Sequence, residues 1–214
     1  MHELRDNIRL RIAALLGFVG LMWFVWLLDL LTPGMRSAAG IGIIPRTWIG
    51  LEGIPVAPLI HGDLDHLLSN TIPLLVLGAL ILLRGVSGFL LVVLVSVLVA
   101  GAGTWLFGSG DAQHIGASGV VFGFFGYLVF RTAFDRRVST AIITLIVAGL
   151  YGTAMAFSLV PEETISWSGH FFGFIGGFAA ARLRYPARSR AVSIHTGELL
   201  RKLEIARPPK DEGH

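Results

Sequence analysis

The sequence predicts an all-α membrane protein with six transmembrane helices. Hydrophobic residues make up 54% of the 214 residues, charged residues only 14%, and the mean hydropathy is +0.72. A soluble domain would have to bury several long apolar segments in one core, whereas a bilayer solvates them once their backbone groups are hydrogen-bonded as helices. Cysteine is absent, so disulfides, zinc–thiolate sites and cysteine nucleophiles are excluded.

Six apolar stretches each approach the roughly 20 residues that span a bilayer. They are expected at residues 12–32, 64–83, 86–107, 116–133, 138–158 and 167–184, the fourth and sixth being slightly short. The first stretch is too long for the apolar region of a signal peptide, so we expect a retained helix. The sequence thus predicts a cytoplasmic segment at 1–11, one six-helix membrane domain at 12–184, and a charged cytoplasmic tail at 185–214. The connector at 33–63 is rich in Gly, Pro and Ile and is expected to lie partly in the membrane interface.

The distribution of basic residues predicts the orientation of the helices. With a cytoplasmic N-terminus, every one of the 17 Lys and Arg residues except Arg36 and Arg46 falls on the cytoplasmic side. The positive-inside rule therefore favours this orientation and places both termini in the cytoplasm. Since no organelle-targeting segment is evident, we expect a multi-pass protein of the plasma membrane.

Polar side chains are costly in lipid, so those at the helix ends are candidate functional residues. In the predicted orientation the second, fourth and sixth helices run from outside to inside, and His66, Asn70, Ser118 and His170 lie in their first turns. All four therefore belong to the outer leaflet. His66 and Asn70 are four residues apart and share one helix face, whereas His61 is rotated away or precedes the helix.

Ser118 has the surroundings of a nucleophile. It opens the fourth helix in Gly116-Ala117-Ser118-Gly119, where unpaired backbone N–H groups and the positive end of the helix dipole favour a developing negative charge. A serine hydroxyl needs a base to take its proton, and His170 is the only histidine that opens a third parallel helix. The two residues form a plausible catalytic dyad.

The remaining groups of an acyl-transfer site are also present. The Asn70 amide, the His66 ring N–H and the Ser118 backbone N–H could donate hydrogen bonds to a tetrahedral oxyanion. No carboxylate is placed to complete a Ser-His-Asp triad, so we expect packing to orient the imidazole. The set needs no metal and no cofactor. Small residues that let membrane helices pack closely recur on the fourth and sixth helices: Gly119, Gly123 and Gly126, and Gly169, Gly173 and Gly177.

Together these motifs resemble those of the rhomboid family of intramembrane proteases. The second helix carries His61-x-x-x-x-His66-x-x-x-Asn70, the fourth Gly116-Ala117-Ser118-Gly119, and the sixth His170-x-x-Gly173-x-x-x-Gly177. The outer loop adds Pro45-Arg46, Gly50-Leu51, Gly53-Ile54 and Pro58, so the resemblance covers about residues 40 to 180. Each motif alone is common, but their order and helix placement are specific.

The resemblance implies a six-helix rhomboid-like bundle that acts as a serine endopeptidase. Its substrates would be single-pass transmembrane proteins, cleaved near the outer leaflet through an acyl-enzyme. Ser118 would be the nucleophile, His170 the general base and acid, and His66 with Asn70 the oxyanion donors.

The resemblance also assigns supporting roles. His61, Gly116 and Gly119 would support the site, and the fifth helix with the loop 159–166 would gate substrate entry. The family often has tyrosine four residues after the serine, whereas this chain has Phe122. A ring stack under the histidine is kept, but a hydroxyl contact is not.

Two other functions remain open at this point. A catalytically silent rhomboid-like protein would bind membrane clients in the same groove, although the intact dyad argues against it. A metal-dependent enzyme or transporter is suggested by His61, His66, His114 and His170 near the outer face, but the chain lacks suitable carboxylate or thiolate ligands and a His-Glu-x-x-His motif. The net charge of +3 requires no nucleic-acid partner in a membrane protein, so the expected partners are the lipid bilayer and transmembrane substrates.

Overall fold

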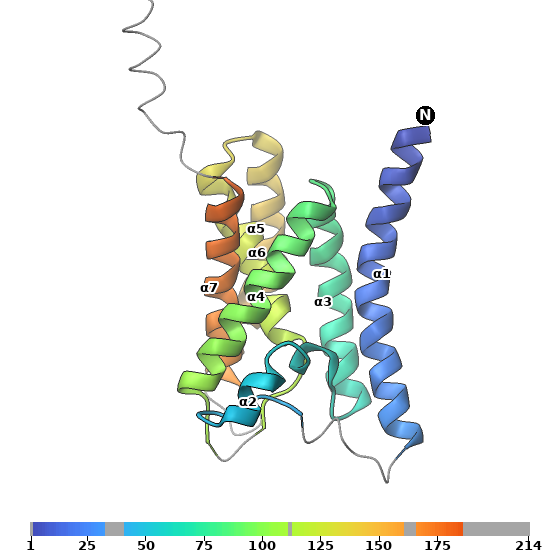
Figure 1. The fold of residues 1–214 in the computed structure, drawn as a ribbon. Coiled ribbons are helices and arrows are strands. Elements are labelled where there is room, and N and C mark those ends of the chain that lie inside the picture. Colours follow the sequence, from blue (N-terminus) through green and yellow to red (C-terminus); the bar gives the residue numbers. More distant parts are fainter. Residues whose placement is uncertain (1, 33–40, 111–112, 161–165, 186–214) are drawn as a thin grey trace, which may run out of the picture.

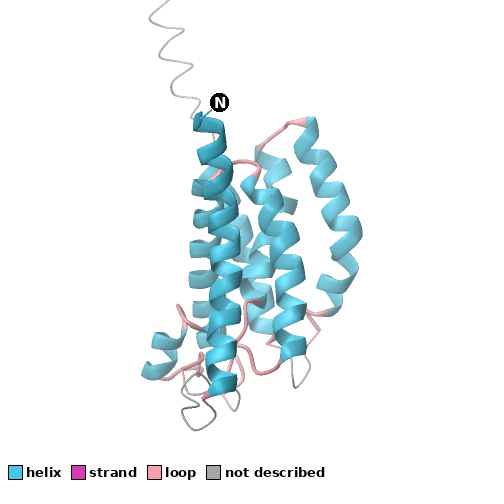
Figure 2. Ribbon diagram, turned by 90° about the vertical axis from the view of Figure 1, so that its right-hand side faces the viewer, coloured by secondary structure: helices cyan, strands magenta, loops and turns pink. Residues whose placement is uncertain are grey.

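The computed structural model describes residues 2–32, 41–110, 113–160 and 166–185, and this part of the chain is all-α apart from an isolated β-bridge between Ile43 and His114. Long helices stand side by side with roughly parallel axes, and two short elements gather at one end of them (Figure 1). A view turned by 90° shows the same upright arrangement (Figure 2). In chain order the elements are α1 (His2–Leu31), α2 (Trp48–Gly53), the 3-10 turn η2 (Ala57–Leu59), α3 (Leu64–Leu82), α4 (Val86–Phe107), α5 (Ser118–Phe134), α6 (Val138–Phe157) and α7 (Trp167–Arg184).

Four of these helices are long and apolar enough to cross a membrane, so the chain is a multi-pass membrane protein. They are residues Ile8–Leu31 of α1 together with α3, α4 and α6. The helix α5 is apolar but has only 17 residues, and α7, which carries several glycines and two arginines, is not among the four. Large apolar side chains such as Leu145 (73% exposed) and Leu150 (72% exposed) face outward, as contact with lipid tails requires.

Each helix predicted from the sequence is present, but two begin at different residues than expected. The helix α1 begins at His2 rather than at residue 12, because residues 2–11 include good helix formers and no Gly or Pro. The helix α5 begins at Ser118 rather than at residue 116, because Gly116 has a φ of 106°, in the left-handed region. The predicted tail at 185–214 lies outside the described residues except for Tyr185.

The helices α5 and α7 touch backbone to backbone, because glycines face each other across their contact. A Cβ atom on Gly173 would fall on the carbonyl of Gly119, and one on Gly177 would fall on the carbonyl of Gly123. On its other side Gly123 receives the side chain of Ser96 from α4. Three helices thus meet at small residues, the packing mode that brings membrane helices closest together.

At the end of the bundle where α5 ends and α6 begins, Asp135 joins three elements. It follows the last residue of α5, accepts a hydrogen bond from the Thr140 hydroxyl of α6 (3.0 Å), and lies 3.5 Å from Nη2 of Arg84, in the turn between α3 and α4. The Arg84 guanidinium also donates to Thr140 (3.3 Å). The start of α6 is therefore fixed to the rest of the bundle by polar contacts.

At the opposite end of the bundle, Arg46 caps the C-terminus of α4. Its backbone N–H donates to the carbonyl of Trp105 (3.0 Å), and its Nη1 donates to the carbonyls of Gly108 (3.1 Å) and Leu106 (3.3 Å). These carbonyls lie at a helix end, where no intrahelical donor reaches them. The indole N–H of Trp105 donates in return to the carbonyl of Thr47 (2.7 Å), so the outer loop and α4 hold each other in place.

We predict that Gly173→Ala destabilises the bundle, whereas Gly149→Ala does not. The added methyl group at Gly173 must push α5 and α7 apart, which should cost about 1–3 kcal/mol of unfolding free energy. Nothing lies within 4 Å of a Cβ at Gly149 on α6, so this variant is the matched control. Thermal unfolding of both variants in the same detergent measures the difference, and equal losses would contradict the proposed importance of the α5–α7 contact.

Candidate active site

The start of α3 positions two candidate oxyanion donors. The Asp63 carboxylate caps the helix by accepting from the backbone N–H of His66 (2.7 Å), a standard way to satisfy a free N–H in the first turn. Asn70 follows one turn later, is buried, and donates through Nδ2 to the carbonyl of His66 (2.8 Å). A primary amide has two N–H bonds. This contact uses one of them, so the second N–H of Asn70 remains available as a donor.

The loop before α5 is fixed next to His66. Its Gly116 has a φ of 106°, and a Cβ there would meet the imidazole of His66. The ring therefore lies directly over the glycine backbone. The N–H of Gly116 donates to the carbonyl of Ala57 in η2 (2.8 Å), and His114, two residues earlier, forms the β-bridge with Ile43.

His61 supports the same loop by accepting a hydrogen bond through a neutral imidazole. It is 2% exposed, its Nε2 accepts from the backbone N–H of Ala117 (3.3 Å), and its ring lies 5.0 Å from that of His66 in an edge-on arrangement. Burial lowers the pKa of His61 to about 4, and the neighbouring His66 ring adds to the shift. At neutral pH His61 therefore carries no charge and keeps its acceptor nitrogen.

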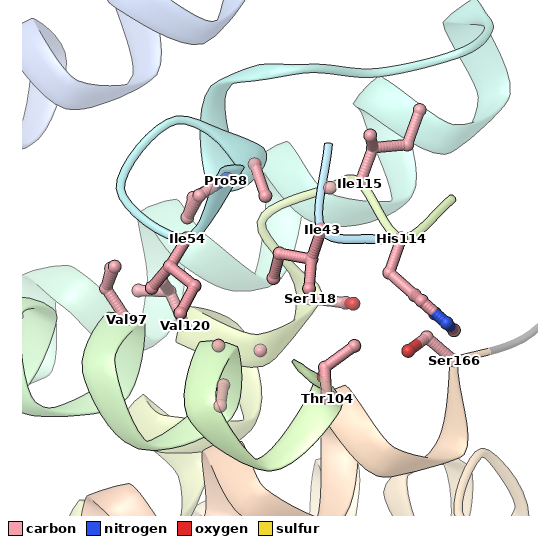
Figure 3. A pocket seen from close by; sticks show the side chains of 16 residues that line it. Ile43, Ile54, Pro58, Val97, Thr104, His114, Ile115, Ser118, Val120 and Ser166 are labelled. Carbon is pink, nitrogen blue, oxygen red and sulfur yellow. The ribbon is translucent and has the colours of Figure 1, made fainter. Parts of the chain in front are cut away.

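Ser118 is the first residue of α5 and lines a cavity. Its N–H belongs to the first turn of the helix, where no intrahelical carbonyl is available. The cavity has a volume of about 40 Å³ and lies between α4, α5 and the outer loop. Figure 3 shows Ser118 facing it together with Thr104 of α4 and Ser166 before α7. Since one water needs about 10–15 Å³, the cavity has room for two or three.

The ring of His170 in α7 stacks on the ring of Phe122, which lies one helical turn after Ser118 in α5. The two ring centroids are 4.2 Å apart and the planes differ by 6°. A Cβ on Gly119 would lie 3.4 Å from the carbonyl of Gly169. Because Gly119 follows Ser118 and Gly169 precedes His170, the nucleophile and base candidates lie on facing turns of α5 and α7.

The imidazole of His170 is held from its far side by α6. Its Nδ1 lies 2.8 Å from the carbonyl oxygen of Ser158, the C-cap residue of α6, and the side chain is only 8% exposed. A carbonyl can only accept, so the hydrogen of this contact is on Nδ1, and whenever the ring is neutral Nε2 is the acceptor nitrogen.

Several contributors to the site could not be read from the sequence. The Ser158 contact uses a backbone carbonyl and leaves no residue-type signal. Thr104, Ser166 and His114 line the cavity beside Ser118, but each lies in a different element, outside the motifs. Among the described residues no three His, Cys, Asp or Glu side chains converge on a point.

A model of the Rhomboid domain family matches residues 51–187 of the chain. An uncharacterized protein of Mycobacterium tuberculosis (strain ATCC 25618 / H37Rv) is 39% identical over 177 residues, which cover 79% of this chain and 73% of the relative. An uncharacterized protein of Mycobacterium leprae (strain TN) is 36% identical over 192 residues, which cover 85% of this chain and 76% of the relative.

A relative named for its activity matches a smaller region. The rhomboid protease GluP of Bacillus subtilis (strain 168) is 33% identical over 135 residues, 60% of this chain but only 25% of that protein. The residues matched by the family model include the helices α3 to α7. The chain belongs to the rhomboid family.

We predict that the folded protein loses stability as the pH falls from about 6.5 to about 4, the interval between the ordinary and the lowered pKa of His61. In this interval the unfolded chain takes up a proton at His61 that the folded chain does not, so this contribution to stability is complete above about pH 6.5, declines as the pH falls through the interval, and does not change further below about pH 4. The contribution is about 3 kcal/mol. Unfolding midpoints measured across this pH range should fall less steeply for His61→Gln, whose amide does not titrate, and identical slopes for both proteins would exclude His61 as the cause.

Proposed function

We propose that this rhomboid-family chain is an intramembrane serine endopeptidase with a Ser118–His170 dyad. The observation that carries the proposal is the stack of His170 on Phe122, which lies one helical turn after Ser118 in α5, together with the close approach of Gly119 to the carbonyl of Gly169. This packing brings a hydroxyl at a helix N-terminus and an imidazole onto facing turns of two helices. A serine nucleophile and its base must come within hydrogen-bond reach of each other, and helix packing this close supports such a pairing.

In the proposed mechanism, Ser118 Oγ attacks the carbonyl carbon of the scissile peptide bond while its proton passes to Nε2 of His170. The carbonyl oxygen becomes the oxyanion of a tetrahedral intermediate. His170 then protonates the amine nitrogen, the C–N bond breaks, and the acyl group remains on Ser118. Water deprotonated by His170 attacks this ester, which releases the carboxylic acid and restores the serine hydroxyl.

The oxyanion would be stabilised by the N–H of Ser118, the His66 ring and the free N–H of Asn70. Support comes from the position of the His66 ring over Gly116, two residues before the nucleophile, and from the unused amide hydrogen of Asn70. The cavity beside Ser118 would supply the hydrolytic water, because its hydroxyl-bearing wall can hold two or three water molecules.

We further propose six membrane spans, with α5 and α7 crossing beside the four more apolar helices and both termini in the cytoplasm. Support comes from the basic residues at the inner ends of α5 and α7, Arg131, Arg182 and Arg184. The N-termini of α3, α5 and α7 then lie at the outer side of the plasma membrane, so single-pass transmembrane proteins would be cleaved near the outer leaflet.

We predict that Ser118→Ala and His170→Ala each abolish labelling by a fluorophosphonate probe and cleavage of a transmembrane substrate. Removing either member of a dyad should lower the rate by about 1000-fold or more, because the serine is then absent or not activated. Probe labelling of the purified protein in liposomes, followed by gel fluorescence, is the measurement. A folded wild-type protein that captures transmembrane clients but neither labels nor yields product would instead be the silent binding protein.

We predict that Asn70→Ala lowers kcat by about 100-fold with little change in KM, since the lost N–H acts mainly on the transition state. The matched control is Ser69→Ala. Ser69 is exposed and its hydroxyl also donates to the His66 carbonyl (2.9 Å), so both variants lose one hydrogen bond to the same acceptor. Equal kcat values for the two variants would show that Asn70 acts only within α3.

A further inference from the structure

The helix α6 is the least embedded of the long helices near the site. Only Thr140, Val147 and Met155 of its 20 residues are buried, and it packs mainly against α5. Its attachment is uneven along its length. The inner half is held by hydrogen bonds, whereas the outer half presents apolar side chains such as Phe157 (72% exposed) to lipid.

The polar attachments of α6 all lie toward its inner end. Besides the Thr140–Asp135 contact, the hydroxyl of Thr144 donates to the carbonyl of Leu128 on α5 (2.7 Å) and pairs with the hydroxyl of Thr132. Side-chain hydrogen bonds between membrane helices contribute roughly 0.6–2 kcal/mol each. The inner half of α6 is therefore the fixed end of the helix.

The outer end of α6 makes one polar contact with the site, through a backbone carbonyl at the C-terminus of the helix. The last carbonyls of a helix have no intrahelical donor, and here the carbonyl of Ser158 receives the Nδ1–H of His170 (2.8 Å). Ser158 itself closes the helix, since its N–H donates to the carbonyl of Ala154. The partial negative charge at this helix end also favours a cation beside it.

We propose that the C-terminal end of α6 is the positioning element of the general base, with the Ser158 carbonyl taking the part that a carboxylate plays in a Ser-His-Asp triad. The carbonyl fixes the tautomer with the hydrogen on Nδ1, so that Nε2 faces the nucleophile. The helix end also stabilises the imidazolium that forms when Ser118 loses its proton. His170 is a base only under the proposed function, and on that function the kinetic part of this proposal rests.

A consequence is that the position of α6 sets the competence of the dyad. Displacing its outer end by one or two ångströms breaks the only polar contact described for the His170 ring, and the imidazole can then turn or adopt the other tautomer. Phe122 still limits the tilt of the ring, but a stacked phenyl group cannot select a tautomer. The helix that faces lipid would thereby govern proton transfer at Ser118.

The test is nitrogen-15 NMR of histidine-labelled protein in lipid nanodiscs at neutral pH, with His170→Ala identifying the His170 signals. In the wild type we expect protonated Nδ1 and unprotonated Nε2. A wild-type His170 with its hydrogen on Nε2, or with both tautomers equally populated, would overturn the proposal without any variant at α6. This readout is independent of activity, so an inactive protein with the expected tautomer would contradict the proposed function and not this inference.

Two variants at Ser158 separate its carbonyl from its side chain. In Ser158→Pro the ring removes the N–H that closes α6 and clashes with the preceding turn, which moves the carbonyl. We expect a mixture of tautomers and a fall in the rate of fluorophosphonate labelling of about 100-fold. Ser158→Ala keeps the backbone and should keep the Nδ1–H tautomer. An unchanged tautomer and labelling rate in Ser158→Pro would contradict the proposal.

A second pair of variants changes residues far from His170, and it tests the proposal even if Ser158→Pro does not fold. Thr144→Val removes two of the hydrogen bonds that hold the inner half of α6, those to Leu128 and Thr132, and it should raise the population of the Nε2–H tautomer of His170. Thr71→Val is the matched control, because it removes a buried hydroxyl that accepts from Trp23 between α1 and α3 (3.1 Å) and leaves α6 alone. Equal tautomer populations in the two variants would show that α6 does not position His170.

Discussion

The backbone contact between α5 and α7 is the constraint on which the candidate site depends. Ser118 and His170 belong to different helices, and their separation is set by how closely the helix axes approach. Carbonyl groups of α5 occupy the space where Cβ atoms of α7 would lie at Gly173 and Gly177. Any larger residue there would move Ser118 away from His170, because the side chains of serine and histidine are too short to bridge a wider gap. The glycines thus determine the geometry of the site as directly as the polar residues do.

Around this contact the backbone itself supplies much of the polar framework. The loop before α5 is held through the N–H groups of Gly116 and Ala117, the end of α4 through carbonyls that Arg46 reaches, and His170 through the carbonyl of Ser158. In a low-dielectric surrounding such groups are costly when unpaired. Hydrogen bonds from these groups to the side chains of the candidate site satisfy the backbone and also order the site.

The sequence predicted the helices and the family, but not the contacts that backbone atoms make. Apolar length located the helices, and the order of the histidine, asparagine, serine and glycine motifs pointed to the family that the comparisons establish. The resemblance to the family also implied a ring stack between Phe122 and His170, and the two rings are stacked in the structure. The start of α1 at His2 was missed, because charge was read as a boundary although the helix continues through it.

The sequence could not predict contacts made by atoms that every residue possesses. A main-chain carbonyl at Ser158 looks like any other until α6 and α7 are placed in space. The same holds for the cavity beside Ser118, which is formed by Thr104 and Ser166 from elements distant in the chain. We expected packing to orient the imidazole. The structure adds to that packing a hydrogen bond from the end of α6.

The shortness of α5 and the composition of α7, with its glycines and arginines, bear on how the protein is made. Entry of a nascent segment into the bilayer depends on its own hydrophobicity, and the helices with Ser118 and His170 are the two long ones that lack the length or composition of a span. They depend on neighbours that have already partitioned into lipid, and α7 is the last of the described helices to leave the ribosome. The helices that carry Ser118 and His170 can therefore pack together only after synthesis has passed residue 184. The candidate site is thus absent from the growing chain while the earlier helices enter the membrane.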